Sequence, residues 1–270
     1  MMPDSAHSPK VALVTGAARG NGLAIARALA LAGNTVYLAD IAADIPAIPY
    51  RLSSPQTLQD AAEALRREGL SVQALVCDVR RAADVERAVA AIEQAAGGVD
   101  ILVNNAGVMV LQPLGEVSEE AWDAQMDVIA KGAFLCSRRV LGRMNQRGWG
   151  RIVNVASVAG HRGLGTGVAY AAAKHALVGL TRALAMEVAN QNITVNAVCP
   201  GTVPTELVRA AGAAAGLAPE AALTQFTARH LTGRPIRPED IAAAVLWLAS
   251  DAAARVNGSS LFVDDGWHAH

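Results

Sequence analysis

Short apolar runs alternate along the chain with longer segments in which apolar residues recur at the period of a helix. The runs predict β-strands at residues 11–15, 34–40, 72–77, 100–103, 151–156, 193–199 and 259–263. Most of their residues are apolar, without a strict alternation, which is typical of strands buried on both faces. Because a helical segment separates most successive runs, the pattern predicts an α/β fold. We expect one doubly wound domain, a parallel sheet of about seven strands with helices on both faces.

Several polar residues mark where the predicted helices begin. Ser54-Pro55 pairs an N-cap with a proline in the first turn and predicts a helix that runs to Glu68. Ser118 is followed by two acids and predicts a long helix to about residue 146. A further helix is expected from Pro238 to Ser250.

The pattern gives one domain, at residues 10–270, after a flexible tail at residues 1–9. We find no internal repeat and no linker. Residues 202–237 form a segment rich in Ala and Gly, with three prolines and two short predicted helices. Because it follows a strand on the expected ligand side of the sheet, we predict that it is a substrate lid.

Composition narrows the class of protein. The 270 residues are 52% hydrophobic and carry a formal net charge of -1, which gives no reason to expect a nucleic acid or a membrane partner. The spacing of the three cysteines, Cys77, Cys136 and Cys199, is not that of metal ligands, and no histidine cluster pairs with them. We therefore expect no metal site. The first residues lack an apolar signal region, and no apolar run reaches the ~18 residues of a membrane span. We therefore expect a cytoplasmic protein.

A glycine-rich turn, TGAARGNG at residues 15–22, connects the first strand to the first helix. Gly16, Gly20 and Gly22 allow a tight turn and close approach of the backbone to a ligand. The helix start then offers amide donors to a pyrophosphate. A glycine turn in this setting is much stronger support for dinucleotide binding than the same turn alone.

Acidic residues at two strand ends suggest how a dinucleotide would be held. Asp40 stands where a carboxylate accepts hydrogen bonds from an adenosine ribose, and it would repel a 2′-phosphate. This repulsion favours NAD over NADP, although Arg19 could pair with a phosphate and so favour NADP. Alternatively, Asp40 is an ordinary turn residue at the end of the strand. Asp78 could accept from the adenine amino group or cap the helix near Asp84.

The chemistry is expected around Ser157, Tyr170 and Lys174. Tyr170 and Lys174 are four residues apart and share one face of a predicted helix. A lysine ammonium there favours the phenolate and lowers the tyrosine pKa, so the pair could move a proton to or from a substrate oxygen that Ser157 also holds. The alternative is an ordinary exposed helix pair. His161 could contact a polar group of the substrate or be a solvated loop residue.

Together these motifs resemble the short-chain dehydrogenase/reductase family, over residues 10–267. The resemblance rests on the glycine turn, Asp40, Asp78-Val79, Asn104-Asn-Ala-Gly107, Ser157, Tyr170-x-x-x-Lys174 and Pro200-Gly201-x-Val203-x-Thr205. It implies that Tyr170 is the acid/base, that Lys174 lowers its pKa and holds the nicotinamide ribose, and that Thr205 contacts the carboxamide. The expected cofactor-binding residues are Gly16, Arg19, Asn21, Gly22, Asp40, Ile41, Asp78, Val79, Asn105, Ala106, Gly107, Tyr170, Lys174, Pro200, Gly201, Val203 and Thr205.

The chain departs from the family pattern at three positions. Ile129 replaces an asparagine that supports a proton-relay water, although the backbone carbonyl there could be sufficient. Asn21 replaces an aliphatic residue of the glycine turn, and Asp265 replaces the first glycine of Asp-Gly-Gly. The segment after Asp40 is long and resembles the insert of the terpene-alcohol (carveol-type) dehydrogenases.

The resemblance implies an NAD(H)-dependent oxidoreductase that interconverts a secondary alcohol and a ketone, with Ser157, His161 and Tyr170 facing the substrate. Two alternatives stay open: an isomerase or dehydratase that uses bound NAD, and a nucleotide-binding regulatory protein whose relay is lost at Ile129. The expected partner is a small alcohol or ketone. The resemblance, together with apolar residues on several sides of two helices, predicts a homotetramer.

Overall fold

The computed structural model describes residues 9–214 and 216–269, so the tail predicted at residues 1–9 lies almost entirely outside it. Seven parallel strands form one sheet in the order β3-β2-β1-β4-β5-β6-β7. The strands are β1 Val11–Thr15, β2 Thr35–Asp40, β3 Val72–Val76, β4 Ile101–Asn104, β5 Gly150–Val155, β6 Ile193–Pro200 and β7 Ser260–Val263. This order reverses between β1 and β4, as in doubly wound sheets, so the predicted fold class is confirmed.

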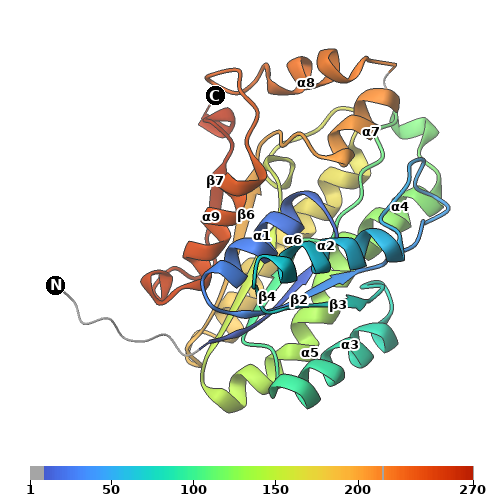
Figure 1. Cartoon of the computed structure of the whole chain (residues 1–270). Helices are drawn as coiled ribbons and strands as arrows, with labels where there is room; N and C mark the ends of the chain where they lie inside the picture. The colour runs from blue at the N-terminus through green and yellow to red at the C-terminus, as the bar shows by residue number, and fades with distance from the viewer. Residues whose placement is uncertain (1–8, 215, 270) are drawn as a thin grey trace.

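Helices cover both faces of this sheet (Figure 1). The larger helices are α1 Gly20–Leu31, α2 Pro55–Arg67, α3 Ala82–Ala96, α4 Glu119–Met126, α5 Gly132–Arg147, α6 Val168–Glu187, α7 Glu206–Ala214, α8 Pro219–Thr227 and α9 Pro238–Ala249. One hydrophobic core joins the sheet to α1, α2 and α9, and a second joins the other face to α3, α5 and α6.

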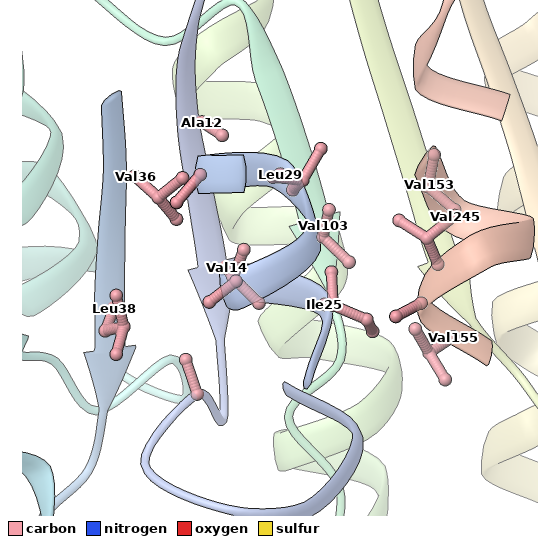
Figure 2. Packing of buried hydrophobic residues seen from close by; sticks show 14 of the residues in the cluster. Ala12, Val14, Ile25, Leu29, Val36, Leu38, Val103, Val153, Val155 and Val245 are labelled. Carbon is pink, nitrogen blue, oxygen red and sulfur yellow. The ribbon is translucent and has the colours of Figure 1, made fainter. Parts of the chain in front are cut away.

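Successive residues of β1 divide between the two cores. Ala12 and Val14 belong to the first core, whereas Val11 and Leu13 belong to the second, as the period of a strand requires. Figure 2 shows Ile25 and Leu29 of α1, with Val245 of α9, against the valines of the central strands. Each such buried side chain contributes about 1.5–3 kcal/mol.

Both predicted serine caps are present. The Ser54 hydroxyl accepts from the Thr57 amide at 3.1 Å, and the Ser118 hydroxyl accepts from the Ala121 amide at 3.1 Å. Each satisfies a donor that the first helical turn leaves unpaired, and removing such a cap costs about 1 kcal/mol. The starts of α2 and α4 therefore follow from local sequence alone.

The long helix predicted from Ser118 is not one continuous α-helix. It widens into a π-helical segment at Asp127–Lys131 before α5 begins at Gly132. A β-carbon at Gly132 would lie 2.7 Å from a methyl group of Val79, so the helix at this point packs tightly against the chain after β3. Single π turns within α-helices are frequent at functional sites.

Three fully buried polar side chains connect β4 and β5 to α6. The Asn104 amide donates to Asn154 Oδ1 at 2.8 Å, and the Asn154 amide donates to Thr181 Oγ1 at 2.9 Å. Thr181 in turn donates to the carbonyl of Leu177 in α6 at 2.8 Å. These bonds hold the helix that carries Tyr170 against the centre of the sheet.

Segment 202–237 contains α7 and α8, the two short helices that the sequence predicts. In Figure 1 both lie beyond one end of the sheet, above α6 in that view. Among the described residues, no helix combines the length and apolar character needed to span a bilayer.

Candidate active site

A cavity of about 440 Å³ lies at the carboxyl ends of the strands. Its lining includes Ser157 and every residue predicted to bind the cofactor. These come from the glycine turn, the ends of β2 to β6, α6 and the start of segment 202–237. The topology therefore brings residues that are far apart in sequence to one edge of the sheet, where ligands bind open α/β sheets.

The glycine turn closes too tightly for any other residue at two positions. Gly16 has φ +63°, and a β-carbon there would lie 2.8 Å from Ala106 Cα. A β-carbon at Gly22 would lie 2.1 Å from the Gly16 carbonyl oxygen. The turn thus has the shape that lets backbone amides approach a pyrophosphate.

Asn105 holds the glycine turn against the end of β4. Its side-chain amide donates to the Thr15 carbonyl at 2.9 Å and to the Gly16 carbonyl at 3.0 Å. Its backbone amide donates to Thr15 Oγ1 at 3.0 Å. Asn105 thereby connects the ends of the neighbouring strands β1 and β4.

Asp40 is buried at the end of β2. Its carboxylate accepts from the backbone amides of Ala18 and Ala42, each at 3.2 Å. Burial raises the Asp40 pKa, an effect that these hydrogen bonds and the charge of Arg19 oppose. The Ile41 amide also acts on this carboxylate, and since a carboxylate has about four acceptor positions, about one remains for a ligand hydroxyl.

Arg19 is engaged by the insert that follows β2. Its Nη2 atom donates to the carbonyl of Arg51 at 3.0 Å, and Arg51 forms an ion pair with Asp44. This contact orients the guanidinium and uses one of its five N–H donors.

Asp78 forms a bidentate ion pair with Arg80, with contacts of 2.9 Å from Nε and 2.7 Å from Nη2. This pairing helps hold the pKa of Asp78 below its usual range although burial opposes it. The N-cap of α3 is Arg81, which forms no side-chain cap, so the suggestion that Asp78 caps this helix is wrong. The carboxylate lines the cavity instead.

Ser157, Tyr170 and Lys174 meet on the other side of the cavity. The Ser157 hydroxyl hydrogen-bonds Tyr170 and also accepts from the Ala159 amide at 3.1 Å. Lys174 Nζ lies 5.6 Å from the centre of the Tyr170 ring and donates to the Val155 carbonyl at 2.7 Å. Because both side chains of the pair are buried, the alternative of an exposed helix pair is wrong.

The ionisation of this pair differs from the expectation. Burial raises the pKa of Tyr170 to about 12, and the hydrogen bond from Ser157 only partly opposes it. Burial also lowers the pKa of Lys174 to about 8. The Tyr170 pKa in the protein alone is therefore raised, opposite to the expected direction, because desolvation of the phenolate outweighs the Ser157 hydrogen bond. The role of Lys174 in favouring the phenolate stays a prediction.

Ile129 lies in the π-helical segment, beside the catalytic pair. It is 1% exposed and packs in the same apolar cluster as Tyr170. A β-carbon on Gly107 would lie 3.8 Å from Lys174 Nζ and 3.9 Å from an Ile129 side-chain carbon. The widened turn is the local bend that a relay through the backbone would need, held by packing rather than by a polar side chain.

His161 does not line the cavity, although the sequence suggested that it faces a substrate. Its Nε2 atom lies 3.0 Å from Ser260 Oγ, and its ring packs 5.0 Å from Phe262. Burial lowers the pKa of His161. The imidazole is therefore used to hold the Ser157 loop against β7.

The sequence analysis missed Tyr50, which reaches the cavity from the insert after β2. Its hydroxyl accepts from the Met109 amide at 3.0 Å, on the chain that follows β4. Burial raises the pKa of Tyr50. Ile45 and Ile48 of the same insert are buried, and these apolar residues in a proline-rich loop were the available signal that it packs inward.

The site fits a nicotinamide dinucleotide in shape and in chemistry. The glycine turn leaves space for backbone contact, Asp40 supplies an acceptor, and the buried Asn21 Oδ1 has no partner among the residues that the structure describes. Within the same described ranges, no group of three or more His, Cys, Asp or Glu side chains could hold a metal ion.

Comparison with known proteins agrees with this geometry. Residues 16–268 match the family model described as Enoyl-(Acyl carrier protein) reductase, adh_short_C2. The chain is 42% identical over 264 residues to the ketoacyl reductase named for the monensin polyketide synthase of Streptomyces virginiae, covering 95% of this chain and 96% of that protein. The chain is a short-chain dehydrogenase/reductase.

Two further similarities support this family assignment. This short-chain dehydrogenase/reductase is 38% identical over 258 residues to the NAD-dependent glycerol dehydrogenase of Listeria innocua, covering 96% and 93% of the two chains. The solved structure of a single-residue variant of the actinorhodin polyketide ketoreductase with NADPH superposes with a TM-score of 0.89 at 36% identity, covering 97% and 98%.

These relatives are reductases and dehydrogenases of secondary alcohols and ketones. The chain is accordingly an oxidoreductase that uses a nicotinamide cofactor. The alternatives of an isomerase or a regulatory protein receive no support.

Proposed function

We propose that this short-chain dehydrogenase/reductase is an NAD(H)-dependent alcohol dehydrogenase/ketoreductase in which Tyr170 is the acid/base. The observation that carries the proposal is the position of Ser157, Tyr170 and Lys174 in one cavity with the glycine turn and Asp40. When bound, the nicotinamide accepts or donates the hydride and, in its oxidised form, adds a positive charge.

Each of the three side chains has a distinct role in moving the proton. With its pKa raised to about 12, the Tyr170 phenol is protonated at neutral pH and can donate to a ketone oxygen. In the reverse direction it must first lose this proton, which positive charge nearby favours. Lys174 supplies such charge when protonated, and Ser157 holds the same substrate oxygen by hydrogen bond.

We propose that the residues predicted to bind the cofactor do so, and that NAD is preferred over NADP. The support is Asp40, whose buried carboxylate would face a 2′-phosphate, and Arg19, which is engaged by the insert. Among the related proteins, one is named as NAD-dependent and one solved structure contains NADPH, so this choice depends on local residues.

Steady-state kinetics with the two cofactors test this preference. We expect a higher kcat/KM with NAD, and Asp40→Ala should narrow the gap mainly by improving NADP binding. Asp60→Ala, an aspartate on the surface of α2, is the matched control and should leave the ratio unchanged. A wild-type preference for NADP would remove Asp40 from this role.

We infer that residues 202–237 form a lid over a small-molecule substrate. Leu207 of α7 and Phe226 of α8 pack against the apolar cluster around Tyr170, which also includes Met109. A panel of secondary alcohols that ranges from polyols to apolar rings, followed at the NADH absorbance, would identify the substrate. Absence of turnover across the whole panel would contradict the proposed activity.

We also infer a homotetramer. Phe134 on α5 and Met186 on α6 are large apolar side chains that the single chain leaves exposed, which is typical of residues that another subunit covers. Light scattering at micromolar protein should give four times the chain mass, and a monomer mass would contradict the inference.

A cytoplasmic location is inferred from the cysteines. Cys77, Cys136 and Cys199 are buried and free, and burial raises the pKa of each thiol, as suits structural residues of a reducing compartment. Cell fractionation with an antibody to the protein would test the location.

A further inference from the structure

Asp265 occupies a backbone conformation that favours glycine. Its φ is +50°, in the left-handed region, where the family pattern has a glycine. Aspartate adopts this region more readily than most residues, but its conformational energy there is still higher than that of glycine. A side chain that adds strain at such a position needs a compensating contact.

The compensating contacts all reach the end of segment 202–237. The Asp265 carboxylate accepts from the Thr232 amide at 2.8 Å and from the Thr232 hydroxyl at 2.7 Å. The Asp265 carbonyl accepts from the Leu231 amide at 2.9 Å. The Thr232 hydrogen bonds hold the pKa of Asp265 below its usual range, so the carboxylate stays ionised near neutral pH.

Neighbouring residues strengthen the same junction. The Leu231 side chain lies over Gly266, where a β-carbon would come within 2.3 Å of it. The Trp267 ring lies 5.9 Å from the His230 ring and 5.7 Å from the Arg229 guanidinium. The chain after β7 therefore holds residues 229–232 through several independent contacts.

This junction is connected to the catalytic cavity through α8. His230 Nε2 accepts from the Thr202 amide at 3.0 Å, and the Thr202 hydroxyl donates to the Phe226 carbonyl at 2.9 Å. Phe226 itself packs against the apolar cluster that contains Tyr170. A displacement of residues 231–232 would therefore also displace Phe226, on the side of the cavity where a substrate would lie.

We propose that Asp265 is a positioning residue, which fixes the end of segment 202–237 so that Phe226 stays packed beside Tyr170. The proposal rests on the assignment of this segment as the substrate lid. It assigns Asp265 no contact with substrate or cofactor. Its effect should therefore appear in substrate binding and lid mobility, and not in cofactor binding.

The test compares Asp265→Gly with two other variants. Asp265→Gly removes the carboxylate and relieves the backbone strain, whereas Asp265→Asn keeps an acceptor oxygen and tolerates the same φ. Asn192→Gly is the matched control, because Asn192 also has a positive φ of 55° but lies at the opposite end of the sheet, before β6. Trypsin is the probe of the lid, since segment 202–237 contains Arg209 and Arg229.

We expect trypsin to cut Asp265→Gly after Arg229 about tenfold faster than wild type, a ratio equivalent to ~1.4 kcal/mol of local opening. Arg234 and Arg237 each precede a proline and resist trypsin, so Arg229 is the cleavage site that reports on the junction. Asp265→Asn and Asn192→Gly should be cut at close to the wild-type rate. With cyclohexanone as probe, KM should rise about fivefold in Asp265→Gly. Its kcat, and its NADH dissociation constant from fluorescence titration, should stay close to wild type.

Cleavage of Asp265→Gly at the wild-type rate would overturn the proposal, as would faster cleavage with an unchanged KM. If Asp265→Gly does not fold, Thr232→Val is the second variant. It removes the hydroxyl bond to Asp265 and the longer bond of 3.4 Å from the Arg234 amide, but keeps the bond from the Thr232 amide to Asp265. It should give a smaller change in the same two measurements, and no change in either would overturn the proposal. Absence of wild-type turnover with cyclohexanone and with the whole panel would count against the proposed function, whereas the trypsin measurement tests the junction without any turnover.

Discussion

The two ends of β5 each hold a buried cation, and their surroundings differ. At the amino end Arg151, 1% exposed, pairs with Asp251 at 3.1 Å, donates to the carbonyls of Gly150 and Asn192, and stacks on Trp149. At the carboxyl end Lys174, 4% exposed, donates to one carbonyl and has no carboxylate partner among the described residues.

The difference separates a structural cation from a functional one. A buried charge without a counter-charge lowers stability, because desolvation is not compensated. The lowered pKa of Lys174 expresses this cost directly. Burial lowers the pKa of Arg151 as well, but there the carboxylate of Asp251 opposes the shift. The carboxyl end of β5 thus holds the cation that lacks a counter-charge.

The largest expected effect is on chemistry at the carboxyl end. Tyr170→Phe keeps the ring and removes the proton, so turnover should fall about 10²–10⁴-fold. Loss of the hydroxyl hydrogen bond with Ser157 should change the free energy of unfolding by no more than about 1.5 kcal/mol. Turnover followed at the NADH absorbance and urea unfolding would measure the two effects. Unchanged turnover would remove Tyr170 from the mechanism.

Exchanging each cation for methionine should move stability in opposite directions. Without cofactor, Lys174→Met should raise the free energy of unfolding by about 1–3 kcal/mol, because it removes an uncompensated buried charge. Turnover should fall at least about 10²-fold. Urea unfolding and NADH absorbance give the two values, and a destabilised Lys174→Met would contradict the comparison.

Arg151→Met is the matched variant at the amino end. It should lower the free energy of unfolding by about 1–3 kcal/mol, because two carbonyls lose a donor and Asp251 loses this ion pair. Its turnover with a saturating substrate should stay close to wild type, since Arg151 does not line the cavity.

The two cations should also differ in how stability depends on pH. Lys174 has a pKa of about 8 in the folded protein and about 10.5 when unfolded, so between these values the unfolded chain binds more protons. The free energy of unfolding of wild type should therefore lie furthest below that of Lys174→Met at pH values under ~8. The difference should shrink as pH rises toward ~10. The loss of unfolding free energy in Arg151→Met, relative to wild type, should stay nearly constant over this range, because Arg151 remains protonated. Urea unfolding at several pH values measures both differences. If the comparison is wrong, the difference between wild type and Lys174→Met will not change with pH.

The smallest effect is expected at Ile129, in the π-helical segment. Because the bend is already present with an apolar side chain, Ile129→Asn should change turnover by less than about tenfold, or ~1.4 kcal/mol in barrier height. Steady-state kinetics with the best substrate of the panel would measure it. A gain of about a hundredfold or more would indicate that the native site lacks a working relay.

Much of the fold was predictable because its determinants are local. Apolar runs, the Ser54 and Ser118 caps and the glycine turn specify elements within a few residues. The right-handed parallel connection then leaves few topologies. The cofactor-binding residues that the family resemblance implies all line one cavity, because strand ends converge at one edge of the sheet.

The rest depends on contacts between distant segments. The orientation of His161 depends on Ser260, 99 residues further along the chain, and the position of Tyr50 depends on the amide of Met109, 59 residues away. The raised pKa of Tyr170 depends on its burial, which the spacing to Lys174 does not reveal. Spacing predicts which residues meet but not what surrounds them.

The side-chain ladder of Asn104, Asn154 and Thr181 also restricts the routes by which the chain can fold. Asn104 lies opposite Asn154 in the parallel register of β4 and β5. A slip of one residue would place a valine opposite Asn104 and leave a buried amide without its hydrogen-bond partner. Such an unpaired group costs about 1–3 kcal/mol. Misaligned sheets are thus penalised when α6 packs on them, so correct strand pairing and docking of α6 are selected together. Replacing all three side chains by apolar ones could preserve stability while letting shifted registers accumulate.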